Sequence, residues 1–381
     1  MRGVMIAGTG NIPFGKHPDR SVVSMGSEAG LKALRDSGLT AREIQMGVFS
    51  NALAGKLFGD LTVGQNIFAD LGMTGMPVFN VENACTSGST AFYLATMAIR
   101  SGEVDSAMVI GSEKMCVPQI GLLSSGNTEI DTLLGLVTPA SFALRARRHM
   151  NEFGTTLKQM AMVSVKSRQH SVLNPVAQFT KAITIDEVLA SPLIADPLTR
   201  LQSCPIADGA SAIVLCSEEM GRRIGACVKV RASVLRTGSY ANPQDLAHWH
   251  TDYEGARIAY EQAGIGPEEI DVVECHDAFS IAEIMHYEAL GLCRPGEGGR
   301  FVQSGAANLG GAHPVNVSGG LLSRGHPVGA TGVEQIVELT LQLQGRAGKR
   351  QVSRARTGLA HCMGGDKAAD TKSMTAIVLA V

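Results

Sequence analysis

The stretch ALRDSGLTAREI at residues 33–44 decides the fold, because a matching stretch, AYEQAGIGPEEI, returns at residues 259–270. Each copy is typical of a helix, a glycine that caps it and a short turn. A strand-like segment follows both copies, MGVF at 46–49 and DVVE at 271–274. Self-similarity at this distance indicates that the chain contains an internal duplication.

Two further pairs of segments repeat in the same order. The dipeptide NV at 80–81 and at 316–317 precedes a turn of small residues and a helix, and AIVL closes each half at 212–215 and 376–379. Apolar strands that alternate with helices are typical of a buried, mostly parallel sheet in an α/β protein. We therefore predict two similar α/β halves, residues 1–220 and 226–381, with a loop domain inserted in the first half at about 116–205.

The composition excludes several classes of partner. The chain has 381 residues, which at roughly 150 residues per domain is enough for more than one domain. Lysine and arginine total 33 against 35 aspartates and glutamates, and aromatic residues make up 4%. This balance argues against nucleic acid or an anionic membrane as a partner.

The location of the protein is predicted from its apolar runs and its cysteines. No apolar run reaches the roughly 18 residues of a transmembrane helix, and the apolar start at residues 3–8 is too short for a signal peptide. The eight cysteines include no CxxC pair, which argues for reduced thiols and against structural zinc. The HWH spacing at 248–250 can bind a metal, but no third ligand accompanies it. We expect a cytoplasmic protein without a metal site.

Cys85 is the first candidate for chemistry. It stands in a turn of small residues, NACTSGST at 83–90, between a strand and a helix. At a helix N-terminus the macrodipole and the free N–H groups favour a thiolate and can hold an oxyanion. We predict that Cys85 is a nucleophile; the alternative is a buried core cysteine.

His326 lies in the equivalent turn of the second half, GGLLSRGHPVGATG at 319–332. Its five glycines allow a close approach of the backbone. In a duplicated fold, equivalent helix starts can meet near the pseudo-twofold axis, which would bring His326 to Cys85. The alternatives are a loop histidine that bonds locally and a phosphate cradle, although neither usual phosphate-loop spacing is present.

His276 and Cys362 complete the set of candidates. His276 follows the strand at 271–274, at the carboxyl end where sites gather in α/β proteins. Glu274 and Asp277 are close enough in sequence to orient it, and a capping histidine is the alternative. Cys362 lies in a further glycine-rich turn, GLAHCMGGD at 358–366.

These four segments together resemble the thiolase superfamily. GHPVGATG at 325–332 matches the GHPxGxTG motif, CMG at 362–364 matches the CxG motif, and HDAF at 276–279 takes the place of the usual NEAF. The HDxF form is similar to sterol-carrier-protein-type thiolases and their bacterial and archaeal relatives. The resemblance covers the whole chain and implies a duplicated, five-layered α-β-α-β-α fold. Two departures accompany it: classical thiolases carry Asn in place of His276, and many sterol-carrier-type enzymes carry Cys in place of Ala278 and lack Cys362.

The resemblance implies CoA-dependent cleavage of a 3-oxoacyl-CoA, or the reverse Claisen condensation, through an S-acyl cysteine. Cys85 would be the nucleophile, His326 its activator and Cys362 the proton donor, with the identity of the proton carrier open between Cys362 and His276. One oxyanion hole would consist of His326 with a water held by His276, and the other of the backbone N–H groups of Cys85 and Gly364. CoA would be a co-substrate, with no permanently bound cofactor.

Two other functions and two partners follow from the same resemblance. A retro-aldol lyase is one alternative, although those relatives usually lack the nucleophilic cysteine, and a non-catalytic acyl-CoA or lipid-binding protein is the other. The family implies a homodimer, and close relatives work with a small zinc-ribbon/OB-fold protein. The apolar stretches at 120–123 and 133–137 would either dock that partner or belong to the core. The insertion offers no residue that identifies the acyl group.

Overall fold

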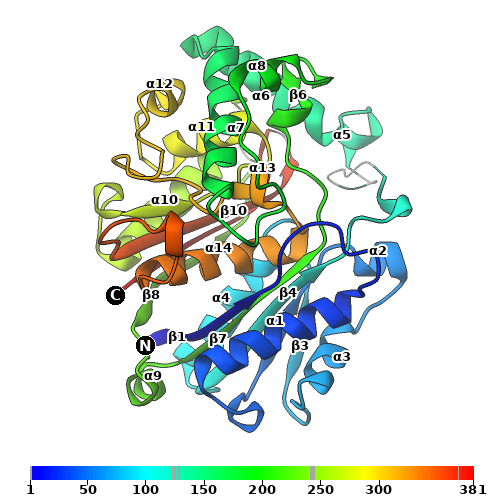
Figure 1. Cartoon of the computed structure of the whole chain (residues 1–381), viewed down its shortest axis with the longest axis vertical. Coiled ribbons are helices and arrows are strands. Elements are labelled where there is room, and N and C mark those ends of the chain that lie inside the picture. The colour runs from blue at the N-terminus through cyan, green and yellow to red at the C-terminus, as the bar shows by residue number, and fades with distance from the viewer. Residues whose placement is uncertain (1, 122–125, 127–128, 241–244, 368) are drawn as a thin grey trace.

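The computed structural model describes residues 2–121, 126, 129–240, 245–367 and 369–381. One nine-stranded sheet runs through both halves in the order β3-β2-β4-β7-β1-β8-β11-β10-β9 (Figure 1). In chain order its strands are β1 (Val4–Asn11), β2 (Gly47–Ser50), β3 (Val78–Val81), β4 (Ser106–Glu113), β7 (Gly209–Ser217), β8 (Val228–Arg236), β9 (Val272–Glu274), β10 (Thr357–Lys367) and β11 (Asp370–Ala380).

The pairing of the strands is more mixed than their alternation with helices predicts. Strand β2 pairs in parallel with β3 and β4, and β9 pairs in parallel with β10, at the two ends of the sheet. The five pairs between them are antiparallel. Strand β11 begins three residues after β10 ends, so these strands form a hairpin and must run antiparallel. Strands β1 and β8 join the two halves through a short ladder.

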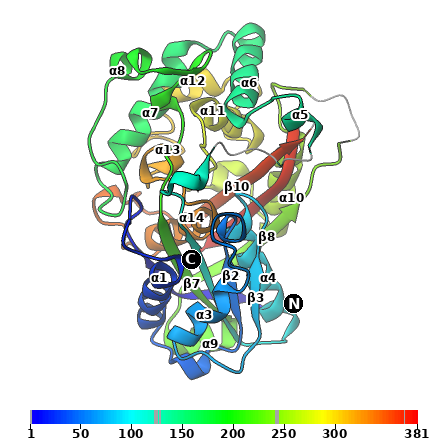
Figure 2. The same cartoon turned by 90° about the vertical axis from the view of Figure 1, so that its right-hand side faces the viewer.

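The helices and the sheet form the expected five layers (Figures 1 and 2). Helices α4 (Ser87–Ser101) and α14 (Val328–Leu343) pack on each other in the central layer. Helix α14 contacts β4 and β7 on one side and β9 and β10 on the other, which explains why nearly all its residues are buried. Helices α1 (Val22–Ser37) and α3 (Val63–Asp70) cover the first half from outside. Helix α10 (His250–Ala263) covers β8 and β11, and α11 (Ser280–Ala289) packs beside it.

Glycines allow α4 and α14 to approach at their N-terminal ends. A Cβ atom on Gly332 would lie 2.5 Å from the backbone nitrogen of Ser89, and one on Gly88 would lie 2.9 Å from that of Val333. Both distances are shorter than a carbon can tolerate, so side chains at these two positions would push the helices apart. The equivalent helix starts of the two halves therefore meet, and the turns that precede them lie close together.

The insertion between β4 and β7 is mostly helical and packs on the second half. Its α6 (Thr138–Phe153) and α7 (Leu157–Ser171) contact α11, and α7 also contacts α13 (Gly320–Arg324). Leu133 and Leu134 of the predicted docking stretch are 67% and 79% exposed, whereas Leu122 and Leu123 lie outside the described residues. The insertion also contains α5 (Ile130–Leu133), α8 (Ile185–Ala190), β5 (Leu193–Ala195) and β6 (Leu198–Thr199).

Three shorter helices complete the list of α-helices among the described residues. Helices α2 (Ala54–Phe58), α9 (Glu218–Ile224) and α12 (Gly298–Gln303) join the larger elements, as do short 3₁₀ turns. Among the described residues no helix is both long enough and apolar enough to cross a membrane.

Candidate active site

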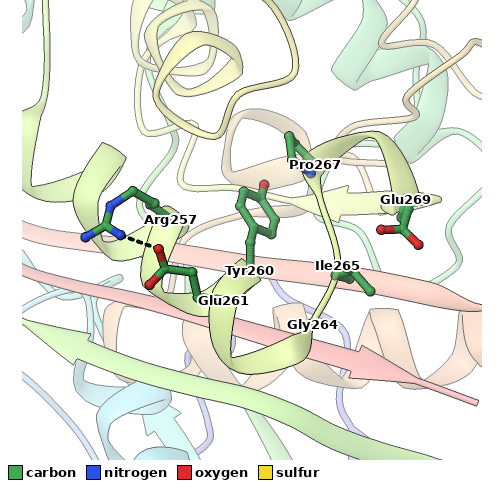
Figure 3. A pocket seen from close by; sticks show the side chains of 7 residues that line it. All are labelled: Arg257, Tyr260, Glu261, Gly264, Ile265, Pro267 and Glu269. Carbon is green, nitrogen blue, oxygen red and sulfur yellow. Dashed lines mark hydrogen bonds and ion pairs between the residues drawn. The ribbon is translucent and has the colours of Figure 1, made fainter.

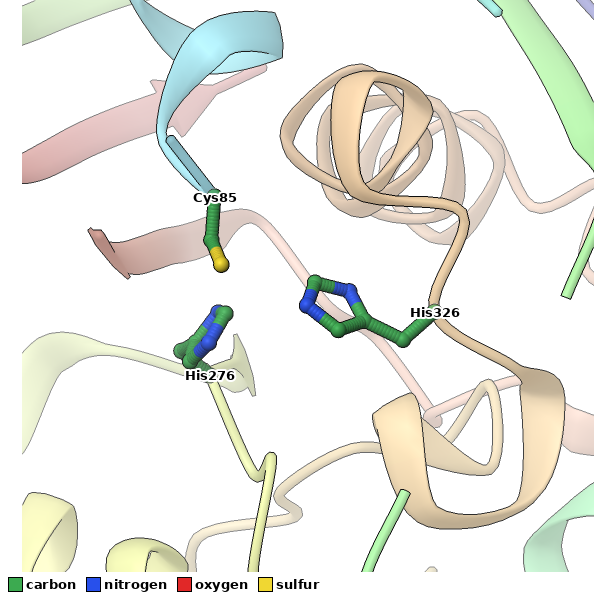
Figure 4. Close-up of side chains that lie close together, drawn as sticks. All are labelled: Cys85, His276 and His326. Carbon is green, nitrogen blue, oxygen red and sulfur yellow. The ribbon is translucent and has the colours of Figure 1, made fainter. Parts of the chain in front are cut away.

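Cys85, His276 and His326 meet in a cavity of about 1410 Å³ between the insertion and the two halves. The sulfur of Cys85 and one nitrogen of each histidine lie within 4.8 Å of one another (Figure 4). Each of the three comes from a different segment: the turn before α4, the loop after β9 and the turn before α14. Three of the four predicted side chains therefore share one face of the cavity.

The turn before α4 presents Cys85 from a strained backbone. Ala84 has a φ of 47°, in the left-handed region that non-glycine residues seldom adopt. Its N–H donates to a carboxylate oxygen of Glu82 at 2.8 Å, and its carbonyl accepts from the hydroxyl of Ser87 at 2.6 Å. Such strain persists only where neighbouring bonds hold it, and it is common at active sites.

Burial of Cys85 acts against the effect that the sequence predicts for the helix start, where a thiolate is favoured. Burial raises the pKa of Cys85 to about 12, and the nearby carboxyl of Glu113 adds to the effect. Helix α4 begins at Ser87, two residues beyond the thiol. Removal of the thiolate from water favours the protonated form. A base must therefore take the proton.

His326 has the bonding pattern of such a base. Its Nδ1 lies 2.7 Å from the hydroxyl oxygen of Thr331, and that hydroxyl donates its one proton to the carbonyl of Pro327 at 3.0 Å. The hydroxyl oxygen must then accept from an Nδ1–H, which leaves Nε2 with a free lone pair. Burial, with the charge of Arg324, lowers the pKa of His326 to about 3, so the ring is neutral. The ring edge away from its backbone faces Cys85 and His276 (Figure 4).

His276 lies between Cys362 and the cavity. Its Nδ1 is 3.3 Å from the sulfur of Cys362, and its ring meets that of His326 nearly at a right angle with centroids 5.1 Å apart. Burial lowers the pKa of His276 well below its usual value, with an added effect from His326. His276 is thus a neutral imidazole at the cavity wall.

Cys362 lies behind the other three side chains. It is 1% exposed, and its S–H is 3.0 Å from the carbonyl oxygen of Cys85, to which it can donate. Burial and the adjacent Cys85 raise the pKa of Cys362 well above its usual value. The structure therefore brings Cys362 to the site, but in contact with Cys85 and His276 rather than with the open cavity.

Gly364 packs directly on the turn that carries Cys85. A Cβ on Gly364 would lie 3.0 Å from the nitrogen of Thr86 and 3.1 Å from that of Cys85. Only glycine permits this approach of β10 to the turn. The backbones of Cys85 and Gly364 are consequently adjacent, as the predicted oxyanion hole requires.

Glu274 and Asp277 position the loops rather than the ring of His276. Glu274 accepts from the hydroxyl of Ser318 at 2.6 Å and pairs with Arg324 at 3.4 Å. Asp277 accepts from the backbone N–H of Leu321 at 2.7 Å. Both carboxylates tie the loop after β9 to the segment that leads to His326.

Three contributors were not found from the sequence. Thr331 fixes the tautomer of His326, and the carboxyl of Glu113 accepts from the N–H of Gly329 at 3.0 Å and from that of Ala52 at 2.8 Å. Asn316 accepts from the N–H of Cys275 at 2.9 Å and so holds the loop before His276. Asn316 belongs to the repeated NV pair, which was the available signal in the sequence. Glu113 gave no signal, because its partners are mostly backbone groups of distant segments.

The HWH segment lies apart from the groupings of metal-type ligands that the described residues form. Nδ1 of His248 bonds to Asp245 at 2.8 Å, and the side chain is exposed. Two groupings of metal-type ligands occur among the described residues, and neither includes this segment. One is the Cys85 site, and the other is Asp252, His286 and His361, where Nε2 of His361 bonds to Asp252 at 2.7 Å.

A second hollow, at the C-terminal end of α10, offers no comparable chemistry (Figure 3). Arg257 pairs with Glu261, and the hydroxyl of Tyr260 donates to the carbonyl of Leu290 at 2.7 Å. Its polar groups are thus satisfied by neighbours, and we assign the chemistry to the Cys85 cavity.

Comparisons with known proteins agree with this geometry. A model described as "Thiolase, N-terminal domain" matches residues 4–219, and one described as "Thiolase C-terminal domain-like" matches residues 232–378. The chain is 40% identical to the benzoylsuccinyl-CoA thiolase subunit BbsB of Thauera aromatica, covering 96% of this chain and 95% of that protein. It is 39% identical to an acetyl-CoA acetyltransferase of Methanothermobacter thermautotrophicus (96% and 97%) and 38% identical to sterol carrier protein 2 of Homo sapiens (96% and 70%).

Two solved structures share the fold. An aldolase of Ltp2 and ChsH2(DUF35) superposes with a TM-score of 0.82 at 22% identity, covering 98% of this chain and 97% of that chain. Human mitochondrial 3-ketoacyl-CoA thiolase superposes with a TM-score of 0.75 at 17% identity, covering 100% and 98%. At these identities the likeness concerns the fold alone.

Proposed function

The chain belongs to the thiolase family, and from this premise we propose that it cleaves a 3-oxoacyl-CoA with CoA, or condenses two acyl thioesters in reverse. It is an enzyme of the acyl-CoA acyltransferase class, as are its full-length relatives. One observation carries the proposal: a partly buried thiol and two neutral histidines converge in a cavity large enough for an acyl thioester. A lyase or a lipid carrier would not require that thiol.

The first step transfers the acyl group to Cys85. Nε2 of His326 takes the thiol proton as the sulfur attacks the 3-keto carbon, so the thiolate need not exist in the resting enzyme. The developing oxyanion lies against the adjacent backbones of Cys85 and Gly364. The carbon–carbon bond then breaks and leaves an S-acyl cysteine and the enolate of a shorter thioester.

The enolate is protonated through His276. Cys362 is covered, so we propose that its S–H proton moves to Nδ1 of His276 while the N–H at Nε2 protonates the enolate carbon. Cys362 is then a thiolate and His276 a neutral ring with the proton on Nδ1. The thiol of CoA next gives its proton to Nε2, and Nδ1 returns one to Cys362, as the CoA sulfur attacks the S-acyl carbon. The Cys85 thiolate then leaves and takes back the proton held on Nε2 of His326, which restores the resting state.

Acyl-enzyme trapping tests the proposal. Incubation with a 3-oxoacyl-CoA in the absence of CoA should add one acyl group to the peptide that contains Cys85, seen by mass spectrometry. Added CoA should remove it, and the Cys85→Ala variant should carry none. Cleavage of the substrate by Cys85→Ala at the wild-type rate would contradict the mechanism and favour a lyase.

The partners expected from the sequence stay proposals. We propose a homodimer that works with a small zinc-ribbon/OB-fold protein, because the Thauera relative is named as a subunit and the Ltp2 structure is a complex with a DUF35 protein. Leu133 and Leu134 in the insertion present exposed apolar surface of the kind that binds a partner. Light scattering of the purified chain, alone and with such a protein, tests both proposals. The cytoplasmic location likewise stays a prediction.

A further inference from the structure

Arg168, near the end of α7, reaches into the same cavity without an anionic partner among the described residues. Its guanidinium lies over the ring of Phe179 at 4.0 Å from the centroid, and both residues line the cavity. Burial alone lowers the pKa of Arg168; no neighbouring charge contributes to the shift. Within the described parts of the chain, the guanidinium forms neither an ion pair nor a hydrogen bond with a protein group.

Buried cations elsewhere in this protein pair with carboxylates. Arg145 pairs with Asp366 at 2.9 Å, Arg350 with Glu338 at 2.9 Å, and Lys166, half a turn before Arg168 on α7, with Glu283 at 2.6 Å. Removal of a cation from water is costly unless an anion compensates it. The half-buried guanidinium of Arg168 is open to the cavity, so an anionic group of a bound ligand would compensate its charge.

The ring of Phe179, on which Arg168 rests, belongs to a segment that is hydrogen-bonded to the residues before His326. The backbone N–H of Phe179 donates to the carbonyl of Ser323 at 3.1 Å, and that of Gln178 donates to the carbonyl of Arg324 at 2.9 Å. These acceptors lie two and three residues before His326. The anion subsite is thus built onto the segment that leads directly to the proposed base.

We propose that Arg168 binds a carboxylate on the acyl group, so that the preferred substrates are 3-oxoacyl-CoA thioesters with a second, free carboxyl group. This inference rests on the proposed thiolase function and specifies its substrate class. A guanidinium whose face rests on an aromatic ring keeps its edge free for a bidentate bond to a planar carboxylate. The phosphates of CoA are strongly hydrated, and the cavity offers them the exposed cations Lys56 and Arg200.

Kinetics with a matched pair of substrates tests the subsite. The pair consists of two 3-oxoacyl-CoA thioesters of equal chain length, one ending in a methyl group and one in a carboxylate. The wild-type enzyme should prefer the carboxylate. Arg168→Gln should lower kcat/KM for the carboxylate by about 10- to 100-fold and leave the methyl substrate nearly unchanged, because a charge-assisted bond is lost only from the former. For the carboxylate substrate, kcat/KM of Arg168→Lys should lie between the values of the wild-type enzyme and Arg168→Gln.

The controls separate this inference from the proposed function. Lys158→Gln removes a positive charge from the exposed face of the same helix and should alter neither substrate. Cleavage of the methyl substrate by Arg168→Gln at the wild-type rate verifies that the variant folds and that the thiolase function holds. A wild-type enzyme that cleaves both substrates equally well, and an Arg168→Gln variant that keeps the same ratio, would overturn the inference alone. So would a loss shared by both substrates that vanishes when dephospho-CoA replaces CoA, since Arg168 would then bind a CoA phosphate.

Discussion

Thr331 controls which nitrogen of His326 can act as the base, and Thr331→Val tests that role. The variant keeps the shape of the side chain but removes the hydroxyl that accepts from Nδ1–H at 2.7 Å. The reactive tautomer would then carry a buried, unsatisfied N–H, which costs about 1–3 kcal/mol. The population with a free Nε2 should fall by roughly 5- to 150-fold, since about 1.4 kcal/mol corresponds to a factor of ten.

Two rates should report this loss equally. Both kcat/KM for thiolysis and the rate at which iodoacetamide alkylates Cys85 depend on removal of the thiol proton by His326. Thr331→Ser keeps the hydroxyl and should restore both rates. Thr340→Val is the matched control, because Thr340 lies on the same helix, is equally buried and donates a similar bond to the carbonyl of Ile336 at 2.7 Å. Wild-type rates in Thr331→Val would refute the assignment of the tautomer. Equal losses of rate in Thr340→Val would show that the effect comes from a weakened helix and not from His326.

Three further predictions concern the remaining side chains of the site. Because the pKa of His326 is lowered to about 3, its base form is complete above about pH 4, so kcat/KM should show no decline between pH 8 and 5.5; a decline centred near 6.5 would contradict the neutral, buried ring. His276→Asn cannot pass a proton from Cys362, so turnover should fall by roughly 10²–10⁴-fold while iodoacetamide still alkylates Cys85; near-normal turnover would limit His276 to holding a water. Cys362→Ala should lose turnover to a similar degree without slowing that alkylation, and the double variant should lose little more than either single one, because both residues serve one proton path.

The sequence predicted the layers of the fold because its repeats are local patterns. A capped helix followed by a strand occurs twice, at 33–44 and at 259–270, and each pattern is fixed by contacts within a few residues. Strand pairing is decided at longer range. The ladder between β1 and β8 joins residues more than two hundred positions apart, and no local pattern announces its antiparallel direction.

The same distinction applies to the site. Cys85 and His326 were predicted together because they lie in the equivalent turns of the two halves, and equivalent helix starts can meet near a pseudo-twofold axis. The raised pKa of Cys85 was not predicted, because burial and the carboxyl of Glu113 act through space. Arg168 gave no sequence signal either: its significance depends on the missing counter-charge, which only the surroundings of a side chain can reveal.

The depth of Cys362 gives a physical reason for the unusual pairing of motifs in this chain. An asparagine at position 276 cannot relay a proton, so a cysteine at 362 would have to reach the substrate itself. Here a histidine stands between that cysteine and the cavity, with its Nδ1 3.3 Å from the sulfur. A histidine can accept at one nitrogen while it donates from the other, so the thiol can remain covered and still supply the proton. The HDxF histidine and the CxG cysteine are therefore compatible as two parts of one relay. Burial also protects the thiol of Cys362 from oxidants in the solvent.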